Sequence, residues 1–163
     1  MKKNIAVVGC GHWGRNLVRN FSELDALAAV CDPNAELAQK YAKDYAVSNV
    51  SFLEIINDAS IEGVVLAVPA RLHASLAVEA MNAGKHVYVE KPLAMNQIEA
   101  RQMIDTSNKM NVRLMVGHLL QYHPIFIAVR DLVVSGELGD LNYIYSNRLS
   151  FGKVRSEEDV IWS

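Results

Sequence analysis

Short apolar runs alternate with segments of helical spacing along most of this 163-residue chain, and this alternation limits the possible folds more than any other feature. Strands that alternate with helices are joined by right-handed crossovers, which build a parallel sheet covered on both faces. The sequence therefore predicts an α/β fold with a Rossmann-type doubly wound parallel sheet. Strands are expected at residues 4–8, 27–31, 63–68, 86–90 and 112–116.

Helical spacing of apolar residues fills the segments between these strands. Ser51 and Glu54 match a capping box, which predicts a short helix after them. The other helices are expected from about Trp13, across 37–45, and at 72–83 and 96–110.

The pattern changes near residue 120. Pro124 suits the first position of a helix that runs to Ser135, and residues 141–151 then alternate in the way of a one-sided antiparallel strand. We therefore predict a doubly wound unit at 1–121 and, at 122–163, the first helix and strand of a truncated α+β domain. A lone strand cannot bury its apolar face, so we expect homo-oligomer contacts through 141–151, whose apolar side holds Leu141, Tyr143, Tyr145, Leu149 and Phe151.

Charge and composition exclude several classes of partner. The 16 basic and 18 acidic residues give a net charge of −2, which offers no electrostatic basis for binding nucleic acid or an anionic membrane. The apolar runs are too short to span a bilayer, and the start of the chain shows no signal-peptide pattern. Cys10 and Cys31 have neither disulfide-framework nor metal-site spacing, which indicates reduced thiols, no metal and a cytoplasmic protein.

The glycines of Val-Val-Gly-Cys-Gly-His-Trp-Gly stand between the first expected strand and its helix. Gly9, Gly11 and Gly14 match the dinucleotide fingerprint, in which the glycines permit a tight turn, close approach of the pyrophosphate and helix–strand packing. Asp32 ends the second strand, where a carboxylate accepts hydrogen bonds from a ribose diol and repels a 2′-phosphate. This favours NAD over NADP; the alternative is that Asp32 caps a helix.

The loop residues His12 and Trp13 are further candidates for cofactor contact. Trp13 could pack beside the cofactor or anchor the helix, and the sequence leaves both readings open.

Several motifs together resemble the Gfo/Idh/MocA family of oxidoreductases, and the resemblance covers essentially the whole chain. They are the glycine loop, Ala67-Val68-Pro69 with His73 after it, Ala83-Gly84-Lys85-His86-Val87, Glu90-Lys91-Pro92, and Gly117-His118. The resemblance implies an NAD-binding Rossmann domain at 1–121 and the start of a substrate and oligomerisation domain at 122–163. Within the family, the glycine loop and the segment from Asn147 to Lys153 look most like members that oxidise the C3 hydroxyl of UDP-N-acetyl-hexosamines for surface polysaccharide or lipid A.

The family resemblance gives Lys91 a catalytic role, in which it hydrogen-bonds the reacting hydroxyl and stabilises developing charge. Its place at the carboxyl end of a strand agrees with that role, although a surface lysine before a turn is the alternative. Pro92 restricts Glu90 and Lys91 to extended geometry, and the resemblance implies a cis bond there.

Other candidates carry open alternatives. By the resemblance Pro69 lies near the nicotinamide, and His73 either lines that pocket or simply begins a helix. His118 and Tyr122 are candidates for substrate contact or for interdomain packing, whereas no role transfers to His123. Arg148 could bind a sugar-nucleotide phosphate or be a solvated strand residue.

Family members carry an Asp-x-x-x-His pair whose histidine is usually assigned as the acid/base, and this chain lacks it. Two hypotheses follow: an NAD-dependent sugar-nucleotide dehydrogenase that is truncated here, or a non-catalytic NAD(H)-binding module that needs a partner chain.

Overall fold

The computed structural model describes residues 3–147 and residue 149. The chain divides into two compact units between Gly117 and His118, and each is described by itself.

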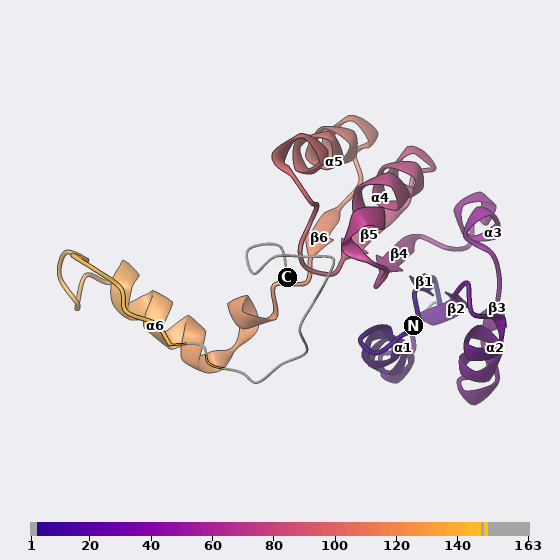
Figure 1. Cartoon of the computed structure of the whole chain (residues 1–163), viewed down its shortest axis with the longest axis horizontal. Helices are drawn as coiled ribbons and strands as arrows, with labels where there is room; N and C mark the ends of the chain where they lie inside the picture. Colours follow the sequence, from indigo (N-terminus) through magenta and orange to yellow (C-terminus); the bar gives the residue numbers. More distant parts are fainter. Residues whose placement is uncertain (1–2, 148, 150–163) are drawn as a thin grey trace. The chain divides into compact units, whose positions relative to one another are not determined.

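The first unit is built on a six-stranded parallel sheet (Figure 1). Its strands are β1 (Ile5–Val8), β2 (Leu27–Cys31), β3 (Ser48–Asn49), β4 (Gly63–Leu66), β5 (His86–Val89) and β6 (Leu114–Val116). The strand order is β3-β2-β1-β4-β5-β6, which reverses direction between β1 and β4. This is the doubly wound topology that the alternation of strands and helices predicted.

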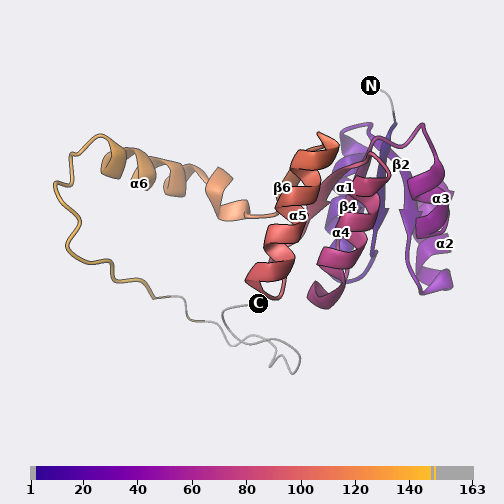
Figure 2. The ribbon, with the colours of Figure 1, turned by 90° about the horizontal axis from the view of Figure 1, so that it is seen from above.

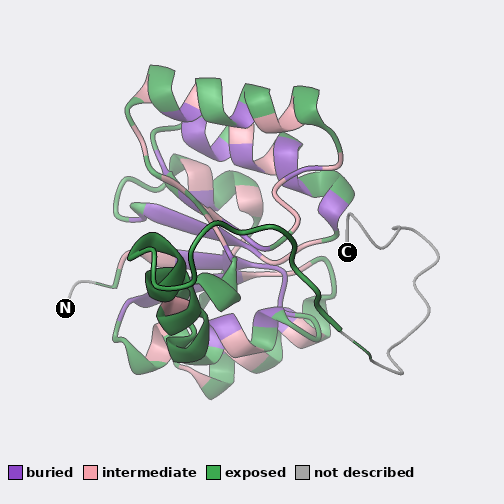
Figure 3. Ribbon diagram, turned by 90° about the vertical axis from the view of Figure 1, so that its left-hand side faces the viewer, coloured by how far each residue is buried: buried purple, intermediate pink, exposed green. Residues whose placement is uncertain are grey.

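Five α-helices of this unit cover the two faces of the sheet. On one face, α1 (Gly14–Glu23) and α2 (Ala35–Asp44) pack against β1, β2 and β4. On the other face lie α3 (Phe52–Asn57), α4 (His73–Asn82) and α5 (Gln97–Met110), with α4 and α5 side by side (Figure 2). The central strands of the sheet are largely buried between helices whose outer turns are exposed (Figure 3). Side chains alternate along a strand. Val7 therefore packs in the apolar core beneath α1 and α2, whereas Ala6 and Val8 pack in the core beneath α3, α4 and α5.

The predicted strands and helices of this unit are all present, most with slightly tighter bounds. The capping box is confirmed: the Glu54 amide donates to Oγ of Ser51, and the Ser51 amide donates to the Glu54 carboxylate. Strand β3 was not predicted, because it consists of two exposed polar residues that pair only with β2. Helix α4 is preceded by a 3-10 turn, η1 (Ala70–Leu72).

The second unit contains η2 (Leu119–Tyr122) and α6 (Pro124–Val134). Pro124 is the first residue of α6, as predicted, and Nδ1 of His123 accepts a hydrogen bond from the Ile125 amide. The strand expected at 141–151 is not found among the described residues of that segment, because residues 141–147 and 149 lie outside any strand. A strand needs a paired neighbour for its backbone groups, and no described segment pairs with this one. Residues 148, 150 and 151 lie outside the described residues.

Within the described residues, no helix combines the length and the apolar character needed to cross a membrane.

Candidate functional site

The residues predicted to bind the cofactor lie at the carboxyl ends of four neighbouring strands. Asp32 follows β2, the glycine loop follows β1, Pro69 comes shortly after β4, and Lys91 comes shortly after β5. The sheet order β2-β1-β4-β5 places these loops in one row. After β1 the chain turns to a helix on one face of the sheet, and after β4 it turns to a helix on the other face. Doubly wound sheets bind their ligands in the crevice between two such strands, at their carboxyl ends.

The three glycines of the loop are required for different reasons. Gly9 has a φ of 91°, and an added Cβ would lie 2.5 Å from the carbonyl oxygen of Ala67. An added Cβ on Gly14 would overlap the carbonyl oxygen of Gly9. At Gly11, by contrast, nothing lies within 4 Å of an added Cβ. The fold itself therefore needs glycine at 9 and 14, whereas Gly11 leaves open the space that a pyrophosphate fills in this motif.

The N-terminus of α1 faces the same loop. No side chain caps it, and its first turn contains no acidic residue. A helix N-terminus of this kind attracts the negative charge of a phosphate. His12 and Trp13 are exposed on this loop, and the 44% exposure of Trp13 leaves its ring accessible to a ligand.

The carboxylate of Asp32 is held by two backbone amides. Its Oδ2 accepts from the Cys10 amide at 2.7 Å, and its Oδ1 accepts from the Asn34 amide at 2.8 Å. Each oxygen keeps a lone pair for a ribose hydroxyl. The alternative that Asp32 caps α2 is wrong, because the N-cap of that helix is Asn34, whose side chain accepts from the Leu37 amide.

The two cysteines beside this carboxylate are free thiols. Burial, and then the charge of Asp32, raise the pKa of Cys10 to about 12. The same two causes raise the pKa of Cys31. Because the thiolate is the reactive form, both are poor nucleophiles near neutral pH.

Lys91 is exposed directly after Glu90, which is only 7% exposed. Glu90 accepts a hydrogen bond from the Tyr88 hydroxyl at 2.9 Å through Oε1, and one from the Lys91 amide at 3.3 Å through Oε2. The Lys91–Pro92 peptide bond is cis, as the family resemblance implies. The carboxylate of Glu90 is therefore fixed against the backbone that carries Lys91.

Gly117 makes room for this arrangement from β6. An added Cβ would overlap the Tyr88 hydroxyl oxygen and lie 3.0 Å from Oε1 of Glu90. Neither Tyr88 nor the steric role of Gly117 was foreseen from the sequence. Two signals in the sequence concerned Gly117: it belongs to the Gly117-His118 motif of the family resemblance, and it directly follows an expected strand.

The two remaining candidates of this row differ in accessibility. Pro69 is exposed at the N-cap of η1. His73 is 1% exposed, and its ring nitrogens lie 2.7 Å from the carbonyl oxygen of Pro92 and 2.9 Å from that of Val68. The geometry thus favours contact of His73 with the two loops over an open position in a pocket.

Three candidates for substrate contact lie beyond this unit. His118 and Tyr122 are exposed residues of the second unit. Arg148 lies outside the described residues. All three stay predictions.

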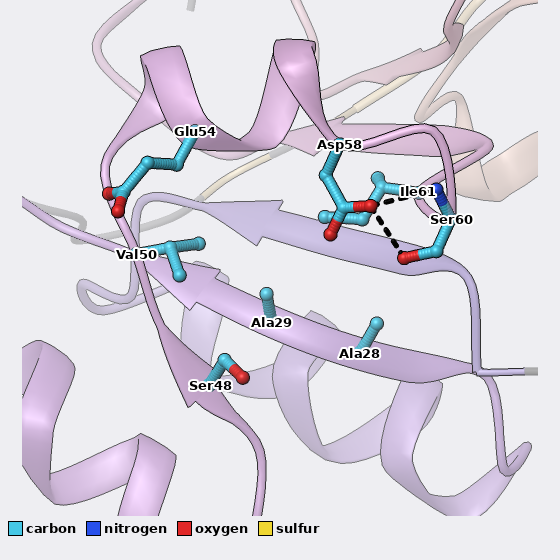
Figure 4. Close-up of a pocket in the computed structure, with 8 residues that line it drawn as sticks. All are labelled: Ala28, Ala29, Ser48, Val50, Glu54, Asp58, Ser60 and Ile61. Atoms are coloured by element: carbon cyan, nitrogen blue, oxygen red, sulfur yellow. Dashed lines mark hydrogen bonds between the residues drawn. The ribbon is translucent and has the colours of Figure 1, made fainter.

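A groove of about 170 Å³ lies beside α3, and its walls contain none of the predicted site residues (Figure 4). Oδ1 of Asp58 accepts hydrogen bonds there from the Ser60 amide and hydroxyl. The residues that line this groove are Ala28, Ala29, Ser48, Val50, Glu54, Asp58, Ser60 and Ile61.

Among the described residues, no group of three or more His, Cys, Asp or Glu side chains could hold a metal ion.

Known proteins resemble this chain in sequence and in fold. It is 31% identical to the UDP-N-acetylglucosamine 3-dehydrogenase of Acidithiobacillus ferrooxidans over 95% of the chain and 48% of that protein. It is also 31% identical to an inositol 2-dehydrogenase of Salmonella paratyphi B, over 83% of the chain and 41% of that protein. A crystal structure of the Acidithiobacillus enzyme matches with a TM-score of 0.74 and 29% identity, over 78% of this chain and 42% of that one. The chain thus spans less than half the length of these relatives.

A family model described as "Oxidoreductase family, NAD-binding Rossmann fold" matches residues 3–118. The match covers the sheet, the glycine loop, Asp32 and the Glu90-Lys91-Pro92 turn. It confirms NAD as the cofactor, in agreement with the open space at Gly11 and the position of the Asp32 carboxylate. The chain therefore belongs to the Gfo/Idh/MocA family of NAD-binding oxidoreductases.

Proposed function

We propose that the protein is an NAD-dependent dehydrogenase that oxidises the C3 hydroxyl of a UDP-N-acetyl amino sugar, on the way to surface polysaccharide or lipid A. The observation that carries this proposal is the row of cofactor-binding groups along the sheet edge, which ends at the exposed Lys91. The similarity to UDP-N-acetylglucosamine 3-dehydrogenase over 95% of the chain supports the substrate class.

We assign a part of the dinucleotide to each loop of this row. The ribose of adenosine binds the carboxylate of Asp32 at β2, and the pyrophosphate lies at Gly11 and the N-terminus of α1. The nicotinamide then extends past β4 toward β5, where it reaches Pro69 and the Glu90-Lys91-Pro92 turn. His12 and Trp13 flank the pyrophosphate on the exposed side of the loop.

The chemistry of this row follows from Lys91. NAD, when bound, accepts the hydride of the sugar carbon. The ammonium group of Lys91 donates a hydrogen bond to the hydroxyl oxygen and stabilises the negative charge that grows there as the proton leaves. The proton passes to a general base, for which the family resemblance implies the histidine of an Asp-x-x-x-His pair. The 163-residue sequence contains no such pair.

The rest of the proposal concerns the second unit and its surroundings. His118, Tyr122 and Arg148 contact the sugar nucleotide, and residues 122–163 begin the substrate domain. Residues 141–151 take part in a homo-oligomer of a cytoplasmic enzyme. The apolar side chains of Leu141 and Tyr143 in that segment are exposed, which supports an interface.

Two other functions have specific support. Oxidation of a polyol is one, since an inositol 2-dehydrogenase is similar at the same identity. A non-catalytic NAD(H)-binding module that needs a partner chain is the other, since all the proposed cofactor-binding residues lie within the first unit.

The experiment that separates these functions is an NADH titration of the purified chain, followed by turnover assays with NAD. The candidate substrates are UDP-N-acetylglucosamine, its uronate and myo-inositol. Reduction of NAD with a UDP-amino sugar supports the main proposal, and reduction with inositol supports the polyol. NADH binding without turnover supports the module for this chain, and turnover would mean that Lys91 and neighbouring groups suffice without the Asp-x-x-x-His pair. Failure to bind NADH contradicts all three.

A further inference from the structure

His73 lies between two loops at the carboxyl edge of the sheet. Its Nδ1 is 2.7 Å from the carbonyl oxygen of Pro92, and its Nε2 is 2.9 Å from the carbonyl oxygen of Val68. The side chain is 1% exposed, so water does not compete for these contacts. Both partners are carbonyl oxygens, which only accept, so a ring nitrogen forms a hydrogen bond only where it carries the hydrogen; the bond that joins the two loops is the one from Nδ1 to Pro92.

The two carbonyls belong to the two loops that the nicotinamide half of the cofactor reaches. Val68 precedes Pro69 after β4, and Pro92 follows Lys91 after β5. Strands β4 and β5 are paired, with Leu66 opposite Val89, so the two loops start from neighbouring points. The Glu90 amide still donates to the carbonyl oxygen of Leu66 at 3.0 Å, and past this bond His73 contacts both loops.

We propose that His73 is a positioning residue, which ties the loop after β4 to the Lys91-Pro92 turn and so sets where Lys91 stands relative to the nicotinamide. The inference rests on the proposed function for the identity of the bound cofactor. It gives His73 no contact with NAD, because both ring nitrogens already face protein carbonyls and the ring is buried.

A comparison of two ligands separates positioning from a general structural role. NADH contains the nicotinamide, whereas ADP-ribose keeps the adenosine, the pyrophosphate and the second ribose but lacks it. Loss of the link disturbs only the loops at β4 and β5, so His73→Gln should weaken NADH about three- to tenfold, the size of one lost hydrogen bond. The affinity for ADP-ribose should change less than about twofold. A merely structural role would weaken both ligands equally, and that result would overturn the proposal.

Two conservative variants test the two contacts of His73 separately. The amide nitrogen of an asparagine reaches about the place of Nδ1, and that of a glutamine reaches about the place of Nε2. His73→Asn should therefore keep the contact with Pro92, and His73→Gln the contact with Val68. Because Pro92 adjoins Lys91, His73→Asn should bind NADH more tightly than His73→Gln, and the reverse order would contradict the assignment.

His86 offers a matched control at the opposite end of the sheet. It starts β5, and its Nδ1 accepts a hydrogen bond from the Arg113 amide at 2.9 Å. His86→Gln should leave the ratio of NADH to ADP-ribose affinity unchanged. If wild type binds neither ligand, the proposed function fails, whereas wild-type binding with an unchanged ratio in both His73 variants defeats the positioning role alone.

A measurement on the unmutated chain covers the case in which the variants do not fold. A buried ring N–H that donates to a carbonyl exchanges slowly with water. The wild-type NMR spectrum should therefore contain a slowly exchanging Nδ1 proton of His73, coupled across the hydrogen bond to the carbonyl group of Pro92. Rapid exchange at Nδ1, or a proton coupled only to Val68, would show that the link does not exist.

Discussion

The backbone amide of Cys10 donates a hydrogen bond of 2.7 Å to Oδ2 of Asp32, and this bond joins the glycine loop to the end of β2. The carboxylate therefore has two tasks, since it fixes the loop that receives the pyrophosphate and offers its remaining lone pairs to the adenosine ribose. Each task makes a separate contribution to cofactor affinity.

Replacement of Asp32 should weaken NADH and change cofactor preference. Asp32→Ala removes a charged acceptor, whose hydrogen bonds are worth about 1.5–3 kcal/mol, so NADH affinity should fall tenfold or more. It also removes the repulsion of a 2′-phosphate, so the affinity for NADPH relative to NADH should rise. Fluorescence titrations with both cofactors measure this.

Asn34 provides the control for this change, because it caps α2 two residues away. Asn34→Ala should lower the free energy of unfolding by about 1 kcal/mol through loss of the cap and leave the preference between cofactors unchanged. Equal effects of the two substitutions on cofactor preference would contradict the role of Asp32.

The glycine loop predicts opposite outcomes for two chemically identical substitutions. Gly11→Ala should leave the melting temperature close to that of wild type, because an added Cβ meets nothing within 4 Å, yet it should abolish most NADH binding by filling the pyrophosphate space. Gly14→Ala should lower the melting temperature, because its Cβ would overlap the carbonyl oxygen of Gly9. Thermal melts and NADH titrations of both variants test the pair. A Gly11→Ala variant that binds NADH normally would show that the cofactor does not approach this point.

The contrast between these residues shows what the sequence could predict. The expected strands and helices of the first unit depend on short-range patterns, and the structure confirms that they are present. That Asn34, not Asp32, caps α2 could not be read in advance, because both residue types cap helices and stand two positions apart.

Contacts across the sheet escaped prediction for a different physical reason. The pairing of Val89 with Val116 brings Gly117 beside Tyr88 and Glu90, and no local pattern encodes that register. Similarly, a strand at 141–151 depends on a partner strand that no described segment supplies. The alternation of apolar and polar residues predicts which side of a strand is apolar, but it does not predict which segment packs against that side.

The capping box of α3 should make part of the free energy of unfolding depend on pH. Its hydrogen bonds with Ser51 lower the pKa of Glu54 below 4.5. A carboxyl group with a lowered folded pKa stabilises the fold above its unfolded pKa, and this contribution is lost as the pH falls through the folded value. Glu54→Gln should therefore be less stable than wild type at neutral pH, and the difference should shrink below about pH 4.5.

Urea unfolding at several pH values measures this convergence, with the exposed Glu79→Gln as a control for the loss of one negative charge. A difference between wild type and Glu54→Gln that persists unchanged into acid would mean that the ionised carboxylate contributes nothing.

The packing of Gly117 against Tyr88 and Glu90 predicts a rescue between two substitutions. Gly117→Ala places a Cβ on the Tyr88 hydroxyl oxygen, which must move away and give up its hydrogen bond to Glu90. The variant should be less stable by about 1–3 kcal/mol, the usual cost of overpacking, and should bind NADH less tightly because the turn at Lys91 shifts. Tyr88→Phe removes the oxygen that clashes, so Gly117→Ala should cost less in that background. A double-mutant cycle of unfolding free energy and NADH affinity measures the coupling. Because the residual contact with Glu90 at 3.0 Å remains, the rescue should be partial; strictly additive effects would show that the hydroxyl does not occupy the space that Gly117 leaves open.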